Sequence, residues 1–183
     1  HAPTFVAPKA NGPYVSPHIG PAPYHELDWG EGVDVGPMRV TALRARHWSR
    51  RKAGDMNQAL WAAYAIETPA GPIYFAGDTA HRGGRHFDEA AAFAGPYRLA
   101  LLPIGAYEPR DFMRDQHMNP EEAVDGFQRC GARAALAIHH ATIQLTNEGM
   151  DEPAERLARA LEGAGIPQER FRAPPPGSSW DVP

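Results

Sequence analysis

The segment from Leu99 to Ala123 constrains the fold of this chain more than any other. An apolar run over residues 99–102 stops at Pro103-Ile104-Gly105, and an irregular stretch then leads to Asn119-Pro120, where a helix is expected to begin. That stretch carries four polar or titratable side chains: Tyr107, Glu108, Arg110 and His117. Such groups on a loop at the end of a buried strand are typical of an active-site rim.

Strands and helices are expected on both sides of this segment. The predicted strands cover residues 4–7, 38–43, 59–67, 73–76, 99–102, 134–138 and the neighbourhood of Phe171, with 8–32 as an extended loop. The predicted helices cover residues 88–94, 120–130 and 152–164. Because short apolar strands alternate with helices and 59–76 forms a hairpin, we expect an α/β fold with a mixed sheet. Residues 1–183 are expected to form a single domain, with 173–183 as a Pro-rich tail.

Composition argues against several classes of protein. The net charge of −4 gives no reason to expect a nucleic-acid partner. No apolar run approaches the roughly 20 residues that span a bilayer, and the N-terminus lacks a signal-peptide pattern. The single Cys130 excludes an internal disulfide and is expected to be a buried thiol. A soluble protein, cytoplasmic or peripheral at a membrane rather than secreted, is expected, and its oligomeric state is left open.

Potential metal ligands follow the predicted strands. Four of them lie just beyond a strand's C-terminal end: His47, Asp78, His117 and His139. Open α/β sheets place their ligands at this edge, imidazole and carboxylate suit Zn²⁺, Mn²⁺ or Fe²⁺, and a carboxylate can bridge two cations. Each residue alone has a plainer interpretation, because a histidine after a strand is more often structural and Asp78 could cap a turn.

Several motifs together resemble a known family. They are His47-Trp48, Phe75-Ala76-Gly77-Asp78-Thr79, Leu102-Pro103-Ile104-Gly105-Ala106-Tyr107-Glu108-Pro109-Arg110, Gln116-His117, Pro120-Glu121-Glu122-Ala123 and Ala137-Ile138-His139. They resemble the metallo-β-lactamase superfamily, and within it the branch of N-acyl-phosphatidylethanolamine-hydrolysing phospholipases D and their bacterial relatives. The resemblance covers roughly residues 4–172.

The resemblance implies an αββα sandwich of mixed sheets with a dinuclear metal site at one edge. By motif match, His47 would bind one metal, His139 the other, and Asp78 would bridge both. Two zinc ions are expected, with manganese or iron as alternatives, and a hydroxide held between them would attack a small-molecule or lipid phosphodiester. Asp78 and His117 are therefore the catalytic candidates. The candidates for substrate contact are Trp48, Tyr107, Glu108, Gln116 and His140.

The superfamily's signature His-x-His-x-Asp-His does not occur in this sequence. The chain is therefore expected to correspond to the C-terminal portion of the fold and to carry only part of the ligand set. Two alternatives stay open: a catalytically inactive remnant that serves binding or assembly, and a lactonase of the same superfamily. The basic run at 50–52 could meet an anionic head group at a membrane surface, and His81 and His86 are expected to be solvated.

Overall fold

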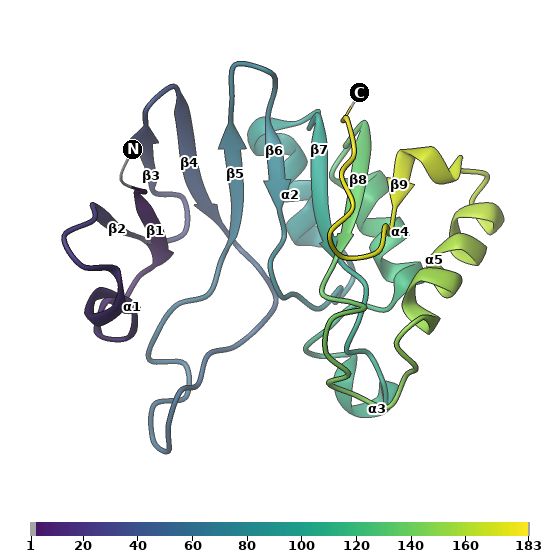
Figure 1. Cartoon of the computed structure of the whole chain (residues 1–183), viewed down its shortest axis with the longest axis horizontal. Coiled ribbons are helices and arrows are strands. Elements are labelled where there is room, and N and C mark those ends of the chain that lie inside the picture. The colour runs from purple at the N-terminus through teal and green to yellow at the C-terminus, as the bar shows by residue number, and fades with distance from the viewer. Residues whose placement is uncertain (1–2, 183) are drawn as a thin grey trace.

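A seven-stranded mixed sheet lies at the centre of the computed structural model, which describes residues 3–182 (Figure 1). In spatial order its strands are β3 (Gly32–Val35), β4 (Met38–Leu43), β5 (Ala63–Glu67), β6 (Ile73–Phe75), β7 (Leu99–Pro103), β8 (Ala134–Ile138) and β9 (Phe171–Arg172). Neighbours from β3 to β6 are antiparallel, whereas β6 to β9 are parallel. Consequently β4, β6, β7 and β8 all run in the same direction, and their carboxyl ends meet at one edge.

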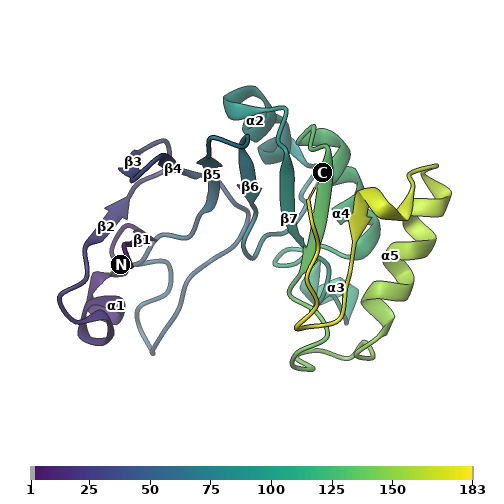
Figure 2. The same ribbon diagram turned by 45° about the horizontal axis from the view of Figure 1, so that its top comes forward.

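Helices cover one face of this sheet (Figures 1 and 2). They are α2 (Arg85–Ala94), α4 (Pro120–Arg129) and α5 (Glu152–Gly163), with α4 packed between β7 and α5. The core beneath them includes Tyr74 and Phe87. Their rings meet edge to face with centres 6.1 Å apart, a separation typical of aromatic pairs. Asn119 begins α4 as predicted, because its side chain accepts from the N–H of Glu122 while the Glu122 carboxylate accepts from the N–H of Asn119.

The prediction of an extended loop over residues 8–32 is wrong. This region forms α1 (Gly12–Ile19) and β2 (Tyr24–Leu27), and β2 pairs in parallel with β1 (Phe5–Pro8) in a separate two-stranded sheet. Asn11 anchors the start of the helix, since its Nδ2 donates to the carbonyl oxygens of Pro8 and Leu60 at 2.8 and 3.0 Å. The helix has Pro near its start and Pro17 inside it. Because proline usually ends or interrupts a helix, the sequence pattern did not indicate one here.

Other element boundaries shift by a few residues. β5 begins at Ala63 rather than 59, and α2 begins at Arg85 rather than 88. The short helix α3 (Arg110–Met113) and the 3₁₀ helix η1 (Gln168–Arg170) were not predicted. No helix in the described part of the chain is both long and apolar enough to cross a membrane.

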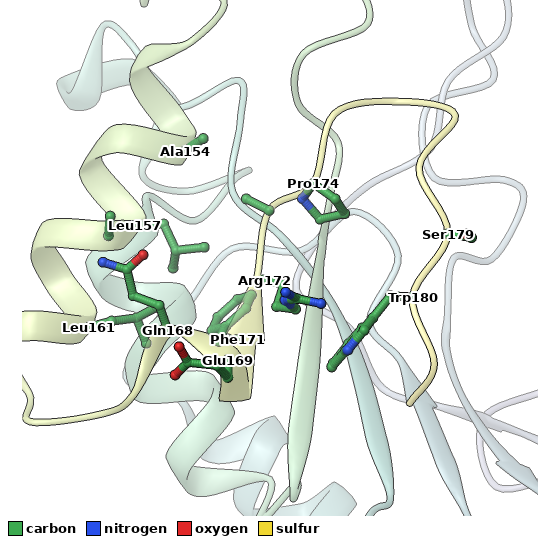
Figure 3. Close-up of a pocket in the computed structure, with 12 residues that line it drawn as sticks. Ala154, Leu157, Leu161, Gln168, Glu169, Phe171, Arg172, Pro174, Ser179 and Trp180 are labelled. Atoms are coloured by element: carbon green, nitrogen blue, oxygen red, sulfur yellow. The ribbon is translucent and has the colours of Figure 1, made fainter. Parts of the chain in front are cut away.

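The described part of the predicted tail packs onto the domain. Val182 accepts a hydrogen bond of 2.8 Å from the Arg98 guanidinium, and the Arg172 guanidinium lies 5.4 Å from the centre of the Trp180 ring. Together with α5 and β9, this segment lines an open pocket of about 440 Å³ (Figure 3). The expected buried thiol is confirmed, because Cys130 is fully buried and that burial raises its pKa to about 11.

Candidate metal centre

The carboxylate of Asp78 lies between two imidazoles at the carboxyl edge of the sheet. Its Oδ2 is 3.8 Å from Nε2 of His47, and its Oδ1 is 3.6 Å from Nε2 of His139. The three residues follow β4, β6 and β8, strands that share one direction. The strand directions therefore bring together three side chains that are up to 92 positions apart in the chain, each oxygen facing a different ring.

His117 completes the cluster from the loop between α3 and α4. Its ring centre lies 5.1 Å from that of His47 and 5.1 Å from that of His139. Burial, together with the neighbouring His139 and His47, lowers the pKa of His117 to about 4, and burial also lowers the pKa of His47. Both imidazoles are therefore neutral near pH 7, which is the form that ligates metals.

Thr79 ties the neighbouring segments together. Its fully buried hydroxyl accepts a hydrogen bond of 2.8 Å from the N–H of Arg46, and the N–H of Ala80 donates to the Arg46 carbonyl at 2.7 Å. The carbonyl of Thr79 accepts from the N–H of Met118 at 3.1 Å. The segments that carry His47, Asp78 and His117 are thus joined through one buried threonine, a role that sequence reading missed.

The backbone at His139 is unusual. His139 has a φ of +58° and Ala106 has a φ of +61°. Residues other than glycine rarely adopt this left-handed backbone conformation. A Cβ on Gly105 would lie 2.1 Å from the carbonyl oxygen of His139, so only glycine permits this close approach. The Pro-Ile-Gly turn of the sequence is therefore needed where β7 and β8 end side by side.

The candidates for substrate contact fall into two groups. Trp48 lies beside His47, with ring centres 6.2 Å apart, and its indole N–H donates to Oε1 of Gln116 at 2.9 Å. Tyr107 is fully buried, and its hydroxyl donates to Glu152 on α5 at 2.9 Å. Their contact with a substrate stays a prediction, but Trp48 and Gln116 are at the cluster whereas Tyr107 braces a loop against α5.

Glu108 and His140, the remaining two candidates, take different positions. The Glu108 carboxylate accepts from the N–H of Arg110 at 2.9 Å and lies 3.8 Å from the Arg156 guanidinium, so it braces the same loop. His140 directly follows His139, and its Nδ1 is buried without a hydrogen-bond partner among the described residues. Of these two, His140 is the one with a free polar atom.

The expectation that His81 and His86 are solvated is wrong. His86 is 2% exposed, and its Nε2 lies 3.3 Å from the Thr79 hydroxyl. Burial, together with the nearby charges of Arg46 and His81, lowers the pKa of His86 to about 4. His81 is paired with Asp125 on α4 at 2.6 Å. The glycines near these histidines suggested an open loop. Instead, Asp125 of α4 contacts His81, and the buried Thr79 contacts His86.

The side chains at this cluster are of the types that bind transition metals, but they are few. Each carboxylate oxygen faces a separate imidazole, and the buried Nδ1 atoms of His47 and His117 have no hydrogen-bond partner within residues 3–182. Each cation would receive one imidazole and one carboxylate oxygen from these residues, fewer than the three or four protein donors of a zinc site. Consistent with this count, the described residues contain no group of three His, Cys, Asp or Glu side chains that could hold a metal ion.

Residues 1–140 match a family model described as "Beta-lactamase superfamily domain". This chain belongs to the metallo-β-lactamase superfamily. N-acyl-phosphatidylethanolamine-hydrolyzing phospholipase D 1 of Caenorhabditis elegans is 35% identical to it over 142 residues, which are 75% of this chain and 40% of that protein. The mitochondrial N-acyl-phosphatidylethanolamine-hydrolyzing phospholipase D of Saccharomyces cerevisiae is 31% identical over 170 residues, which are 90% of this chain and 36% of that protein. The chain thus spans about two-fifths of the length of these relatives.

A solved structure supports the same fold. Igni18, a metallo hydrolase of Ignicoccus hospitalis, superposes with a TM-score of 0.64 at 18% identity, covering 96% of this chain and 66% of its own. The expected α/β fold class with a mixed sheet, that of the metallo-β-lactamase superfamily, is therefore confirmed. The described residues supply one helix-covered mixed sheet of the expected sandwich.

Proposed function

We propose that the protein is a metal-dependent hydrolase of phosphodiesters, of phospholipase D type, with a dinuclear metal centre. The observation that carries this proposal is the Asp78 carboxylate, whose two oxygens face His47 and His139 separately. The two similar proteins named above, which are described as hydrolysing N-acyl-phosphatidylethanolamine, support the choice of a lipid phosphodiester as substrate.

His47, Asp78 and His139 would hold the metals, with zinc as the expected ion and manganese or iron as alternatives. When bound, such a pair of cations supplies a nucleophile from water and absorbs the charge that develops on the phosphoryl oxygens. The ring of His117 lies 5.1 Å from each of the other two imidazoles and is neutral, so its N–H can donate a hydrogen bond to a phosphoryl oxygen or to the leaving-group oxygen. Trp48, held by Gln116, would form the adjacent wall of the substrate site.

Exposed apolar side chains on the site's loops support a lipid substrate. Seven large apolar side chains are exposed in the described part of the chain: Trp48, Met56, Phe93, Phe112, Ile143, Leu145 and Met150. All except Phe93, which is on α2, belong to the three segments that carry His47, His117 and His139. These segments project beyond the same end of the sheet in both views (Figures 1 and 2), and the basic run 50–52 is on one of them. Apolar tips with flanking cations are typical of contact with an anionic membrane surface.

The incomplete donor set favours a second candidate function. With two donors per cation from this chain, metal affinity would be low unless further ligands complete each site. A member of the superfamily that keeps the fold for binding or assembly, without catalysis, accounts for that observation. A lactonase has no specific observation in its favour here, and it enters as one arm of the activity test.

The deciding experiment measures metal content and hydrolysis with the full-length protein. We expect about two transition-metal equivalents and turnover of phosphodiesters rather than lactones. Asp78→Asn should lose at least one equivalent and slow hydrolysis on the order of 10²-fold, because it removes a bridging charge while barely changing shape. Asp111→Asn, on a fully exposed carboxylate of α3, is the matched control and should change neither quantity. Unchanged metal and activity in Asp78→Asn would remove the bridging role, and a metal-free wild type would favour the non-catalytic candidate.

A further inference from the structure

A small basic pocket lies beside His47, and neither Asp78 nor His139 lines it. It has a volume of about 180 Å³ and is lined by Trp29, Arg44, Ala45, Arg46, His47, Trp61 and Arg82, which we call the arginine pocket. Three of these seven residues are arginines, and none is an aspartate or glutamate. A concave site with one sign of charge concentrates ions of the opposite sign.

The three guanidinium groups are poorly neutralised by the protein itself. Within residues 3–182, the Arg46 side chain makes no hydrogen bond or ion pair, although its charge bears on the buried His86. The Arg44 guanidinium lies over the Trp29 ring, 4.7 Å from its centre, and its nearby charge helps to lower the pKa of Asp28, a carboxyl that also pairs with Lys9. Arg82 lies 3.4 Å from one oxygen of Asp115, and both of these side chains are more than half exposed, so this pair neutralises little.

The walls of the pocket are already fixed. The indole N–H of Trp29 donates to the carbonyl of Trp61 at 2.7 Å, and that of Trp61 donates to the carbonyl of Ala45 at 3.1 Å. The two rings meet edge to face with centres 5.7 Å apart. Because the main chain of Arg46 is held by Thr79, the guanidinium groups project from a rigid frame. Only the exposed arginine side chains would then need to be ordered when a ligand binds.

We propose that the arginine pocket binds a phosphate group other than the one that is hydrolysed. Guanidinium groups recognise phosphate through paired, charge-assisted hydrogen bonds, and a phosphate dianion offsets three neighbouring cations better than a singly charged carboxylate does. The group can come from free inorganic phosphate or from a phosphate monoester on a larger ligand. Because His47 forms part of the wall, a ligand held here would lie next to the candidate metal centre.

Calorimetric titration of the full-length protein with inorganic phosphate tests this proposal. Excess EDTA is included, so that phosphate cannot bind to metals and the result does not depend on the proposed hydrolase activity. We expect saturable binding to the wild type and about tenfold weaker binding to Arg46→Gln and Arg44→Gln, since each variant loses charge-assisted hydrogen bonds. Arg159→Gln removes the same charge from an exposed position on α5 and should bind like the wild type.

Two further measurements separate binding from folding and identify the source of the phosphate. Without phosphate, the Tm of Arg46→Gln should equal or exceed that of the wild type, because one of three like charges is gone. Phosphate should raise the Tm of the wild type but not that of the variant. Glycerol phosphate is then compared with inorganic phosphate. If it binds as tightly, the pocket is assigned to a phosphate monoester; if it binds more weakly, the pocket is assigned to free phosphate. No saturable binding to the wild type, or equal affinities for wild type and Arg46→Gln, would overturn the proposal.

Discussion

Glu148 accepts a hydrogen bond of 2.6 Å from the main-chain N–H of Ala106, which lies 42 positions earlier in the chain. The same carboxylate also accepts from the N–H groups of Tyr107 and Glu108 and from the Thr146 hydroxyl. Glu148 is 8% exposed, so one nearly buried side chain holds the whole turn that follows β7. This turn packs directly against the carbonyl of His139, which places Glu148 behind the candidate metal centre.

Glu148→Gln should lower the free energy of unfolding by about 1–3 kcal/mol at pH 7, because a neutral amide leaves buried donors without an acceptor. Burial would raise the pKa of Glu148, but the hydrogen bonds from Thr146 and the main chain outweigh it and hold that pKa below its usual range. The carboxylate's contribution is therefore present above the ordinary pKa of 4.5 and is lost as pH falls through the lowered pKa. Urea unfolding should show a difference that shrinks as the pH falls below 4.5. The exposed Glu155→Gln on α5 is the control, and a pH-independent difference would contradict the ionic contribution.

Thr79→Val should destabilise the protein by about 1–3 kcal/mol, since it keeps the side-chain shape but leaves the N–H of Arg46 without its acceptor. Metal affinity should fall as well, because the segment that carries His47 loses its tie to the segment that carries Asp78. Thr79→Ser retains the hydroxyl and should keep most of both properties. Denaturant unfolding and metal titration check the pair of variants, and identical behaviour of Val and Ser would show that the hydroxyl is not what matters.

His139→Ala should remove about one of two metal equivalents, whereas His47→Ala should remove the other, because each ring faces a different oxygen of Asp78. Metal analysis after gentle dialysis measures the stoichiometry directly. His18→Ala, on the exposed surface of α1, controls for the loss of a histidine. One equivalent in the wild type, lost from both single variants, would indicate one shared ion instead of two.

Phe112→Ser and Ile143→Ser should each weaken binding of the full-length protein to phospholipid vesicles about tenfold, because each removes an exposed apolar side chain from the loops around the site. Co-sedimentation with phosphatidylcholine vesicles that contain phosphatidylserine measures the effect, and binding should fall at high salt if residues 50–52 contribute. Phe93→Ser removes a comparable exposed ring from α2 and is the matched control. If that control weakens binding as much as the loop variants do, the contact is not specific to these loops.

Local patterns determined much of the fold of this chain. The Asn119-Pro120-Glu121-Glu122 sequence carries its own capping box, and the apolar runs at 99–102 and 134–138 became the parallel strands β7 and β8. These signals involve residues within a few positions of one another, so they can be read along the chain. The meeting of His47, Asp78 and His139 also follows from sequence, because each residue comes within a few positions of the end of a strand and the strands share one direction.

Only the tertiary structure decided how that cluster is supported and what surrounds it. Glu148 reaches the turn at Ala106 across 42 positions, and Thr79 reaches Arg46 across 33. His86 is buried although its neighbours suggested a solvated loop, and the arginine pocket gathers side chains from four separate segments. The physical reason is that hydrogen bonds and charges act through space. Their partners have no fixed spacing along the chain, so the packing of the folded chain determines which groups meet.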